Sequence, residues 1–465
     1  MVEKSRRSFI RQSAIVTLGF VALSRCSLSQ SGKETARGLV GKDKGLLPDP
    51  KKYLDLPKGF SYRVISRSGE RMDDGLLVPG RADGMGAFDL GEGKIGIVRN
   101  HENSPKPLEN SPFGKNNENL DQFDSTKMYD AGNGKTPGLG GTTTLVYDEL
   151  TGKVEQQYLS LAGTYRNCSG GMTPWGSWLT CEEDVTRAGG DIEKDHGFVF
   201  EVPVRGAGLV NPKPITAMGR FNHEAVAVDP VTHIVYQTED TSDGLIYRFI
   251  PTNKSDLHAG GRLQVLAIKD HKSLDTRNWN EKTIKLRNPM DVEWLDIDDV
   301  LSPDDDLRLR GFKQGAARFA RGEGMWFGQN ELYFACTNGG PGKFGQVFRY
   351  RLSPNEGTSE EKKEPGKLEL FAESESKTVL NMCDNLTLAP WGDVVLCEDN
   401  GDLNHIWGID VQGRIYPIAC NRSSTSELTG AVFSPSGKTL FVNVQENGDT
   451  LAITGPWEHL QSYLS

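Results

Sequence analysis

The sequence predicts an all-β fold, a six-bladed β-propeller with peripheral insertions whose ring is closed by an N-terminal strand. Three observations predict this fold. The chain is rich in glycine, with 53 among 465 residues; hairpin-like segments recur along it; and strands with aromatic residues follow most of these segments. Hydrophobic residues make up 36% of the chain and charged residues 25%. These values exclude a polytopic membrane protein and argue against disorder.

The N-terminal segment has the features of an export signal. Arg6 and Arg7 stand in the run SRRSFI, which resembles a twin-arginine motif. The uncharged run 12–24 that follows is shorter than the roughly 20 apolar residues that span a bilayer. Residues 1–30 are therefore predicted to be a twin-arginine signal peptide, which directs a folded bacterial protein to the periplasm or the medium. A lipoprotein anchor at Cys26 is the alternative, and Arg25 directly before it disfavours that anchor.

Residues 31–465 are predicted to form a single catalytic propeller domain. Six segments share one pattern: a polar opening, a short apolar strand, a turn of Gly, Pro, Asp or Asn, and a second strand that ends on polar residues. They span residues 85–102, 168–184, 223–240, 323–340, 384–400 and 427–448. Further strands follow most of these hairpins, and residues 61–66 are expected to complete the last blade. Insertions are expected at 103–135 and 271–321.

Acidic residues gather at the ends of these hairpins. A hairpin brings its first and last residues to one edge, so six inner hairpins would place their ends at one mouth of the central channel. The candidate metal ligands at these ends are Glu102, Cys168, Glu182, Glu183, Glu224, Glu239, Glu323, Asp384, Glu398 and Glu427. The same ends carry Asp240 and Asp399, to which no role is assigned.

Carboxylates that lie this close together raise one another's pKa unless cations neutralise them. Oxygen ligands suit Ca²⁺, whereas a Cys thiolate among them favours iron or zinc. The alternative interpretation is that the acids are ordinary solvated loop ends. That interpretation does not explain why acids recur at the same position in five or six repeats, so the pattern predicts a metal centre.

Several segments together resemble a known family. The strings NHE at 100–102, NCSGG at 167–171, TPWGSWLTCEE at 173–183, RFNHE at 220–224, RGEG at 321–324 and ELTG at 427–430 are similar to those of the PhoX alkaline phosphatases. The resemblance implies a six-bladed propeller that hydrolyses phosphate monoesters with Fe³⁺ and Ca²⁺. It implies that Cys168 is an iron ligand and that Arg321 clamps phosphate. It also implies metal-binding carboxylates at Glu102, Glu182 or Glu183, Glu224, Glu323, Glu398 and Glu427.

The residues and the resemblance agree on a metal-dependent phosphoric monoester hydrolase, an alkaline phosphatase. Arg321 and Arg166 are expected to hold the phosphate, with Arg220 as an alternative to Arg166, and Glu323 is expected to take part in catalysis. No Ser or Thr is singled out as a covalent nucleophile, so attack by an oxygen held at the metals is expected. Ser169 stands where Ala is more usual in the family, and the chain is shorter, which bears on substrate range more than on chemistry.

Two other classes of function fit part of the pattern. A calcium-dependent propeller lactonase or esterase needs a single cation and a His or Asp base, and it has no need of Cys168. A non-catalytic propeller that binds protein partners gives no reason for the acids to recur in phase. Small phosphomonoesters are the expected partners of a monomeric chain. The formal net charge of −10 disfavours nucleic acid, and no stable membrane span is expected.

Overall fold

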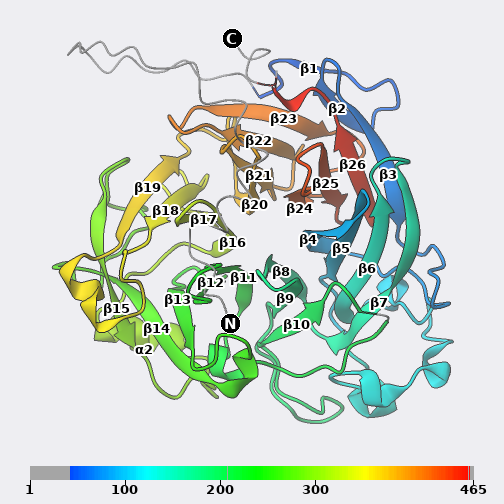
Figure 1. The fold of residues 1–465 in the computed structure, drawn as a ribbon, viewed down its shortest axis with the longest axis horizontal. Helices are drawn as coiled ribbons and strands as arrows, with labels where there is room; N and C mark the ends of the chain where they lie inside the picture. The colour runs from blue at the N-terminus through cyan, green and yellow to red at the C-terminus, as the bar shows by residue number, and fades with distance from the viewer. Residues whose placement is uncertain (1–41, 207, 459, 461–465) are drawn as a thin grey trace. The chain divides into compact units, whose positions relative to one another are not determined.

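The computed structural model describes residues 42–206, 208–458 and 460. The predicted signal peptide and Cys26 lie outside the described residues. Within the described part, β-strands form sheets that are arranged like blades around a central axis, and the first strand of each blade lies innermost (Figure 1). None of the described helices is long and apolar enough to cross a membrane.

Six units each begin with a hairpin next to the axis. The first three units contain β4 (Ala82–Gly91), β5 (Lys94–His101), β6 (Gly140–Asp148) and β7 (Lys153–Thr164); β8 (Asn167–Met172), β9 (Ser177–Glu182) and β10 (Val199–Pro203); and β11 (His223–Val228), β12 (Val235–Glu239), β13 (Ile246–Pro251) and β14 (Gly261–Ile268). The fourth contains β16 (Gly322–Phe327), β17 (Glu331–Cys336), β18 (Gln346–Arg351) and β19 (Lys367–Glu373). The fifth contains β20 (Cys383–Leu388), β21 (Val394–Glu398), β22 (His405–Ile409) and β23 (Ile415–Asn421), extended by β2 (Leu54–Pro57) and β1 (Leu46–Leu47).

The sixth unit closes the ring, as predicted. It contains β24 (Leu428–Phe433), β25 (Thr439–Val444) and β26 (Asp449–Thr454), and its outer strand is β3 (Ser61–Arg67) from the N-terminal part of the chain. β3 runs antiparallel to β26, with pairs from Asp449↔Arg67 to Thr454↔Ser61. The two ends of the described chain are thereby joined by backbone hydrogen bonds, and the blade leaves no open seam between the first and last units.

The six units do not correspond to six separate sheets. The described residues form five hydrogen-bonded sheets, because the third and fourth units are joined into one sheet of nine strands. The joining strand, β15 (Met290–Asp296), lies in the predicted insertion 271–321 and pairs with both β14 and β19. The second unit has three strands, and an isolated bridge joins Phe200 of its outer strand, β10, to Pro214.

Hydrophobic clusters between neighbouring units hold the blades together. Because successive residues of a strand face opposite sides, each strand can pack against both of its neighbours. In β11, Ala225 and Ala227 pack against the fourth unit, whereas Val226 and Val228 pack against the second. Equivalent clusters lie between the other neighbouring units. The innermost strands β4, β8, β11, β16, β20 and β24 contact one another in a closed ring.

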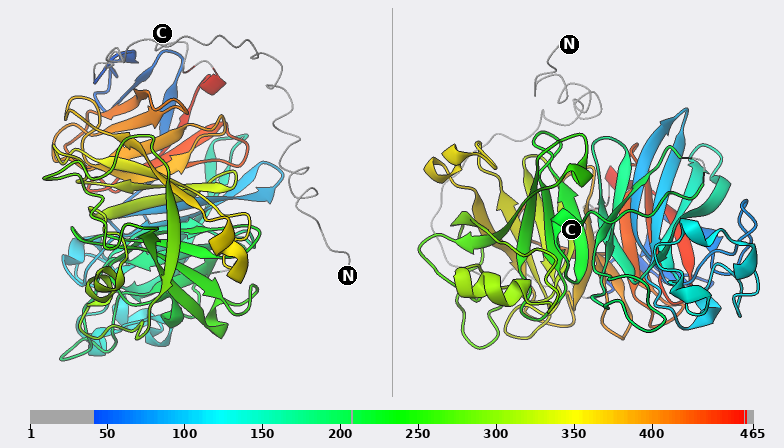
Figure 2. Two further views of the ribbon diagram at one scale, coloured as in Figure 1. Left: turned by 90° about the vertical axis from the view of Figure 1, so that its left-hand side faces the viewer. Right: turned by 90° about the horizontal axis from the view of Figure 1, so that it is seen from below.

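The insertions lie at the periphery. Helix α2 (Leu307–Gln314) lies beside β14 and β15 on the outside of the ring (Figures 1 and 2). The other helices described are short 3₁₀ turns: η1 (Leu108–Asn110), η2 (Leu120–Gln122), η3 (Ser125–Lys127), η4 (Gly132–Gly134), η5 (Thr216–Met218), η6 (Leu257–Ala259) and η7 (Ser359–Lys363). The first four fall in the predicted insertion 103–135, so this segment adds turns without adding a blade strand.

Candidate metal centre

Each of the six innermost strands has a β-bulge near its start. In β20, for example, Cys383 pairs with Glu398 and the next regular pair is Leu386 with Leu396, three residues on in one strand but only two in the other. An extra residue of this kind bends the strand and redirects a side chain. The residue that follows the first pair of each bulge is Asp83, Cys168, Glu224, Glu323, Asp384 or, in the sixth unit, Gly430.

Gly430 is the exception because there is no room for a side chain. Its φ is +64°, and a Cβ at this position would lie 2.4 Å from the carbonyl oxygen of Asp83 in the first unit. Its N–H donates to Oδ1 of Asn385 at 2.6 Å. The sixth unit supplies a carboxylate from Glu427 instead, just before β24.

The bulge residues meet acids from the ends of the second strands. Together these side chains form four overlapping groups, and within each group the donor atoms lie within 4.8 Å of one another. The groups are Asp83, Glu102 and Cys168; Cys168, Glu183 and Glu224; Glu224, Glu323 and Asp384; and Asp384, Asp399 and Glu427. Because each group shares a member with the next, the nine residues form one continuous string, which we call the donor cluster. Glu224 and Glu323 are each only 2% exposed.

The electrostatics of the donor cluster favour cation binding. Burial, together with the neighbouring carboxylates, raises the pKa of Glu224 and Glu323 well above the ordinary value, and burial and Asp399 raise the pKa of Asp384 to about 7. Burial and the adjacent carboxylates also raise the pKa of the Cys168 thiol. So many buried acids cannot all ionise without added positive charge. A donor set of carboxylates and one thiolate fits a mixed site for hard and transition-metal cations.

In three of the six units, the residue immediately before the first pair of the bulge is an arginine. Arg81, Arg166 and Arg321 all have left-handed backbone, with φ of 49°, 44° and 54°. Their side chains are partly exposed, by 28%, 38% and 28%. A non-glycine residue with positive φ is uncommon. The equivalent residue of the fifth unit, Met382, has a φ of 56° as well, so this conformation belongs to the turn before the bulge.

The arginines contact the donor cluster directly. Arg81 and Arg166 both bind Glu102, at 2.5 and 2.7 Å. Burial opposes ionisation of Glu102, but these two guanidinium groups outweigh it and lower its pKa. Arg166 also contacts Oε2 of Glu183 at 2.5 Å, and the same oxygen accepts the thiol hydrogen of Cys168 at 2.8 Å.

Arg321 links two acids of adjacent units. Its Nε and NH2 donate to the two carboxylate oxygens of Asp240, each at 2.8 Å, and NH2 also donates to Glu323 at 2.9 Å. The planar guanidinium is therefore held in a two-point arrangement of the kind that also matches a phosphate group.

Three predicted ligands lie outside the donor cluster. Glu182, Glu239 and Glu398 are the last residues of β9, β12 and β21, and each carboxylate accepts backbone N–H groups of its own blade. The donors are Tyr165, Gly197 and Phe198 for Glu182, Leu245 for Glu239, and Asn381 and His405 for Glu398. Burial raises the pKa of Glu239 to about 8. The structure therefore gives these acids a part in holding strand connections.

Of the other predicted site residues, Glu102, Cys168, Glu183, Glu224, Glu323, Asp384 and Glu427 lie in the donor cluster, with Arg166 and Arg321 against it. Arg220 does not join them. Its guanidinium donates to the carbonyl oxygens of Ser302 and Val185, and the residue is 1% exposed.

Sequence reasoning missed four residues at this centre. Arg81 and Asp83 precede the first predicted hairpin, and Asp240 and Asp399 stand at predicted hairpin ends to which no role is assigned. A signal for two of them is visible in the sequence as a repeated spacing. An arginine stands two residues before Asp83, Cys168 and Glu323, so the pair Arg81 and Asp83 matches the two other pairs.

Comparison with a solved structure supports the propeller fold. Among solved structures, the chain is similar to PhoX of Pseudomonas fluorescens in complex with vanadate, described as a transition state analogue, with a TM-score of 0.64 and 18% identity over 90% of this chain and 98% of that one. A gluconolactonase from Xanthomonas campestris is more distant, with a TM-score of 0.38 and 12% identity over 90% and 99% of the two chains. A search of curated protein sequences finds no significant match.

The sequence model of one family covers most of the chain. The model described as alkaline phosphatase PhoX matches residues 42–448. This range runs from the start of the described residues to the turn between the last two strands, and so includes every member of the donor cluster and all three arginines. The chain therefore belongs to the PhoX family of alkaline phosphatases, which are phosphate monoester hydrolases.

Proposed function

We propose that this protein releases inorganic phosphate from small phosphate monoesters at the donor cluster, with Fe³⁺ and Ca²⁺ as its metals. The observation that carries the proposal is that the nine residues of the donor cluster lie beside three arginines, which occupy the same position in three different blades. Carboxylates alone would repel a phosphate. Cations held by them, together with guanidinium groups at the edge, create a site that attracts it.

The distribution of donors indicates which residues would hold which metal. Cys168 belongs to two groups, one with Asp83 and Glu102 and one with Glu183 and Glu224, so its sulfur stands between two sets of carboxylates. A thiolate favours iron over calcium. The remaining groups, around Glu323, Asp384, Asp399 and Glu427, contain only oxygen donors, which suit Ca²⁺. When bound, the metals would neutralise phosphate charge and activate an oxygen nucleophile.

The arginines would orient the substrate. Arg321 and Arg166 present partly exposed guanidinium groups beside the donors, and Arg81 presents a third. Each can exchange a carboxylate partner for the non-bridging oxygens of a phosphate, with paired N–H donors. Charge that develops on those oxygens during hydrolysis would be stabilised by the same groups, since they are held in place before the reaction begins.

The buried carboxylates of Glu182, Glu239 and Glu398 would keep the site in shape. Each carboxylate binds a backbone N–H group of the segment that follows its strand. These bonds would hold the backbone that carries the adjacent acids Glu183, Asp240 and Asp399. Positioning by a rigid scaffold matters because a misplaced ligand costs metal affinity and rate.

Hydrolysis of an aryl phosphate by the purified full-length chain at alkaline pH tests the proposal. We expect activity that a calcium-selective chelator abolishes and added Ca²⁺ restores. Activity toward a lactone or an aryl acetate, with none toward the phosphate, would instead indicate the lactonase or esterase class. Phosphatase activity that is unchanged after removal of metals would contradict the proposal.

We also propose that the enzyme acts in the periplasm or the medium after twin-arginine export. The support is the Arg6–Arg7 pair and the short uncharged run after it. Replacing both arginines with lysine should retain the enzyme in the cytoplasm. Unchanged export of that variant would contradict this route.

A further inference from the structure

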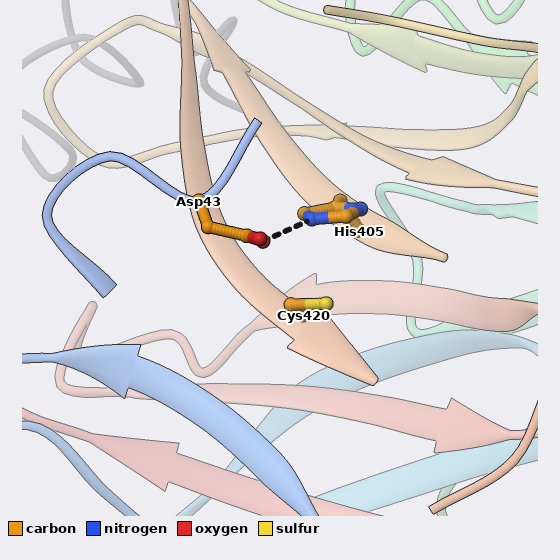
Figure 3. A group of neighbouring side chains, drawn as sticks. All are labelled: Asp43, His405 and Cys420. Carbon is orange, nitrogen blue, oxygen red and sulfur yellow. Dashed lines mark hydrogen bonds and ion pairs between the residues drawn. The ribbon is translucent and has the colours of Figure 1, made fainter. Parts of the chain in front are cut away.

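A second group of metal-binding side chains lies apart from the donor cluster, in the outer half of the fifth unit. His405 of β22 and Cys420 of β23 are directly opposite each other across the antiparallel pair. Asp43 reaches them from the segment before β1 (Figure 3). One donor atom from each residue, an imidazole nitrogen, a sulfur and a carboxylate oxygen, lies within 4.8 Å of the other two. The group shares no residue with the donor cluster.

The imidazole is oriented to offer one nitrogen to this group. Nδ1 of His405 lies 3.2 Å from the carbonyl oxygen of Leu403 and 3.3 Å from Oε2 of Glu398. Both neighbours are acceptors, so Nδ1 carries a hydrogen and Nε2 faces Asp43, 3.0 Å from its Oδ1. Metal-binding histidines commonly use one nitrogen for the metal and donate the other N–H to a carboxylate or a carbonyl.

Burial and charge also favour a cation here. Cys420 is fully buried and His405 is 1% exposed, whereas the Asp43 side chain is 53% exposed. The group can therefore be reached from solvent past Asp43. Three carboxylates, of Asp43, Asp55 and Glu398, lie here with two cationic groups, the imidazolium of His405 and the guanidinium of Arg422, which binds Asp55 at 2.6 Å and Asp43 at 3.2 Å.

We propose that Asp43, His405 and Cys420 bind one divalent transition-metal ion, with Zn²⁺ as the preferred metal. Zinc is held by thiolate, imidazole and carboxylate at about 2.0–2.3 Å, which places ligand atoms roughly 3.3–3.8 Å apart. The present spacings bracket this range, from 3.0 Å between Nε2 of His405 and Oδ1 of Asp43 to an upper limit of 4.8 Å within the group. The sulfur and nitrogen donors disfavour Ca²⁺. Binding releases the thiol proton and the Nε2 proton to solvent. The ion would fasten the segment before β1 to β22 and β23, with water as its fourth ligand.

Spectroscopic titration with Co²⁺ tests this site without reference to phosphatase activity. In a Cys168→Ser background, which removes the thiol of the donor cluster, added Co²⁺ should give a thiolate-to-cobalt charge-transfer band that saturates at about one equivalent and that Zn²⁺ displaces. The additional change Cys420→Ser should abolish the band, whereas Cys397→Ser, a buried cysteine on β21, should leave it unchanged. Absence of the band, or its survival without Cys420, would overturn the proposal.

Variants of the exposed ligand keep the test valid if Cys420→Ser folds poorly. Asp43→Asn changes a solvent-exposed side chain and should weaken Zn²⁺ binding roughly tenfold or more. It should also reduce the rise in Tm that added Zn²⁺ produces. Both Asp43→Asn and Cys420→Ser should retain aryl phosphatase activity, because neither residue lies at the donor cluster. Unchanged Zn²⁺ affinity in Asp43→Asn would overturn the site, whereas loss of phosphatase activity in every protein, wild type included, would count against the proposed function alone.

Discussion

Glu182 and Glu183 are neighbours in the chain, but their carboxylates have opposite surroundings at the end of β9. The carboxylate of Glu182 accepts the backbone N–H groups of Gly197 and Phe198 within its own blade. The carboxylate of Glu183 instead contacts the Cys168 thiol and Arg166 in the donor cluster. The alternation of side chains along a strand thus separates a structural acid from a candidate metal ligand one residue later.

This relationship predicts different consequences for two otherwise identical changes. Glu183→Gln should lower kcat for an aryl phosphate about 100-fold or more and reduce bound iron, because a carboxylate ligand is lost. Glu182→Gln should keep the metals but cost about 1–3 kcal/mol of stability, because an amide cannot accept all the hydrogen bonds of the carboxylate. Metal analysis and thermal unfolding of both variants measure these effects. Loss of iron in Glu182→Gln, with Glu183→Gln unaffected, would reverse the assignment.

Cys168 and Cys181 give a second matched pair. Cys168 lies in the donor cluster, whereas Cys181 is fully buried in the hydrophobic cluster between the second and third units. Cys168→Ser should remove iron and any visible absorption from an iron–thiolate bond. Cys181→Ser should retain both and lower Tm, because it buries a hydroxyl among apolar side chains. Absorption spectra and metal content test this, and a coloured, iron-containing Cys168→Ser protein would show that the sulfur is not a ligand.

The three equivalent arginines predict an effect on substrate binding. Arg321→Lys and Arg81→Lys should each raise KM for the aryl phosphate about 10-fold, and inhibition by inorganic phosphate should weaken in parallel, because lysine cannot donate two parallel hydrogen bonds. Arg220→Lys is the control, since Arg220 binds backbone carbonyls away from the cluster. Steady-state kinetics measure both constants. An unchanged KM and phosphate inhibition constant in Arg81→Lys would remove Arg81 from the site.

His196 predicts a pH dependence of stability. It lies between Glu182 and Asp130, at 2.6 and 3.3 Å. Burial opposes its protonation, but the two carboxylates outweigh burial and raise its pKa to about 9. Because the native pKa lies above the unfolded value near 6.5, the stabilisation is fully present below about pH 6.5 and is lost as pH rises through 9. Tm should therefore fall between pH 7 and 10 by more in the wild type than in His196→Gln. Equal falls would show that His196 does not contribute.

Much of the fold was predictable because its signal is local and repeated. Hairpins with strong turns and alternating apolar residues recur six times, and residues 61–66 match the outer strand of the last blade, which pairs as predicted. The pairing of β15 with both β14 and β19 was not predictable. It depends on how an insertion packs against two neighbouring edges, and this information is not contained in the pattern of β15 itself.

The candidate site was predictable to the level of the hairpin end but not of the single residue. A hairpin end brings several acids to one edge, yet only alternate side chains face the axis, so Glu239 and Asp240 have different partners. The bulge shifts this phase by one residue, and its presence shows only in the strand register. The sequence pattern therefore placed the start of the first hairpin at residue 85, after Asp83, and did not separate Glu398 from its neighbour Asp399.

Anomalous diffraction from crystals of the purified enzyme, measured at the iron absorption edge, tests the central claim most directly. We expect an iron peak within bonding distance of the Cys168 sulfur, surrounded by the carboxylates of the donor cluster, with calcium at the all-oxygen donors around Asp384. A fully active enzyme whose donor cluster contains no metal peak would contradict it.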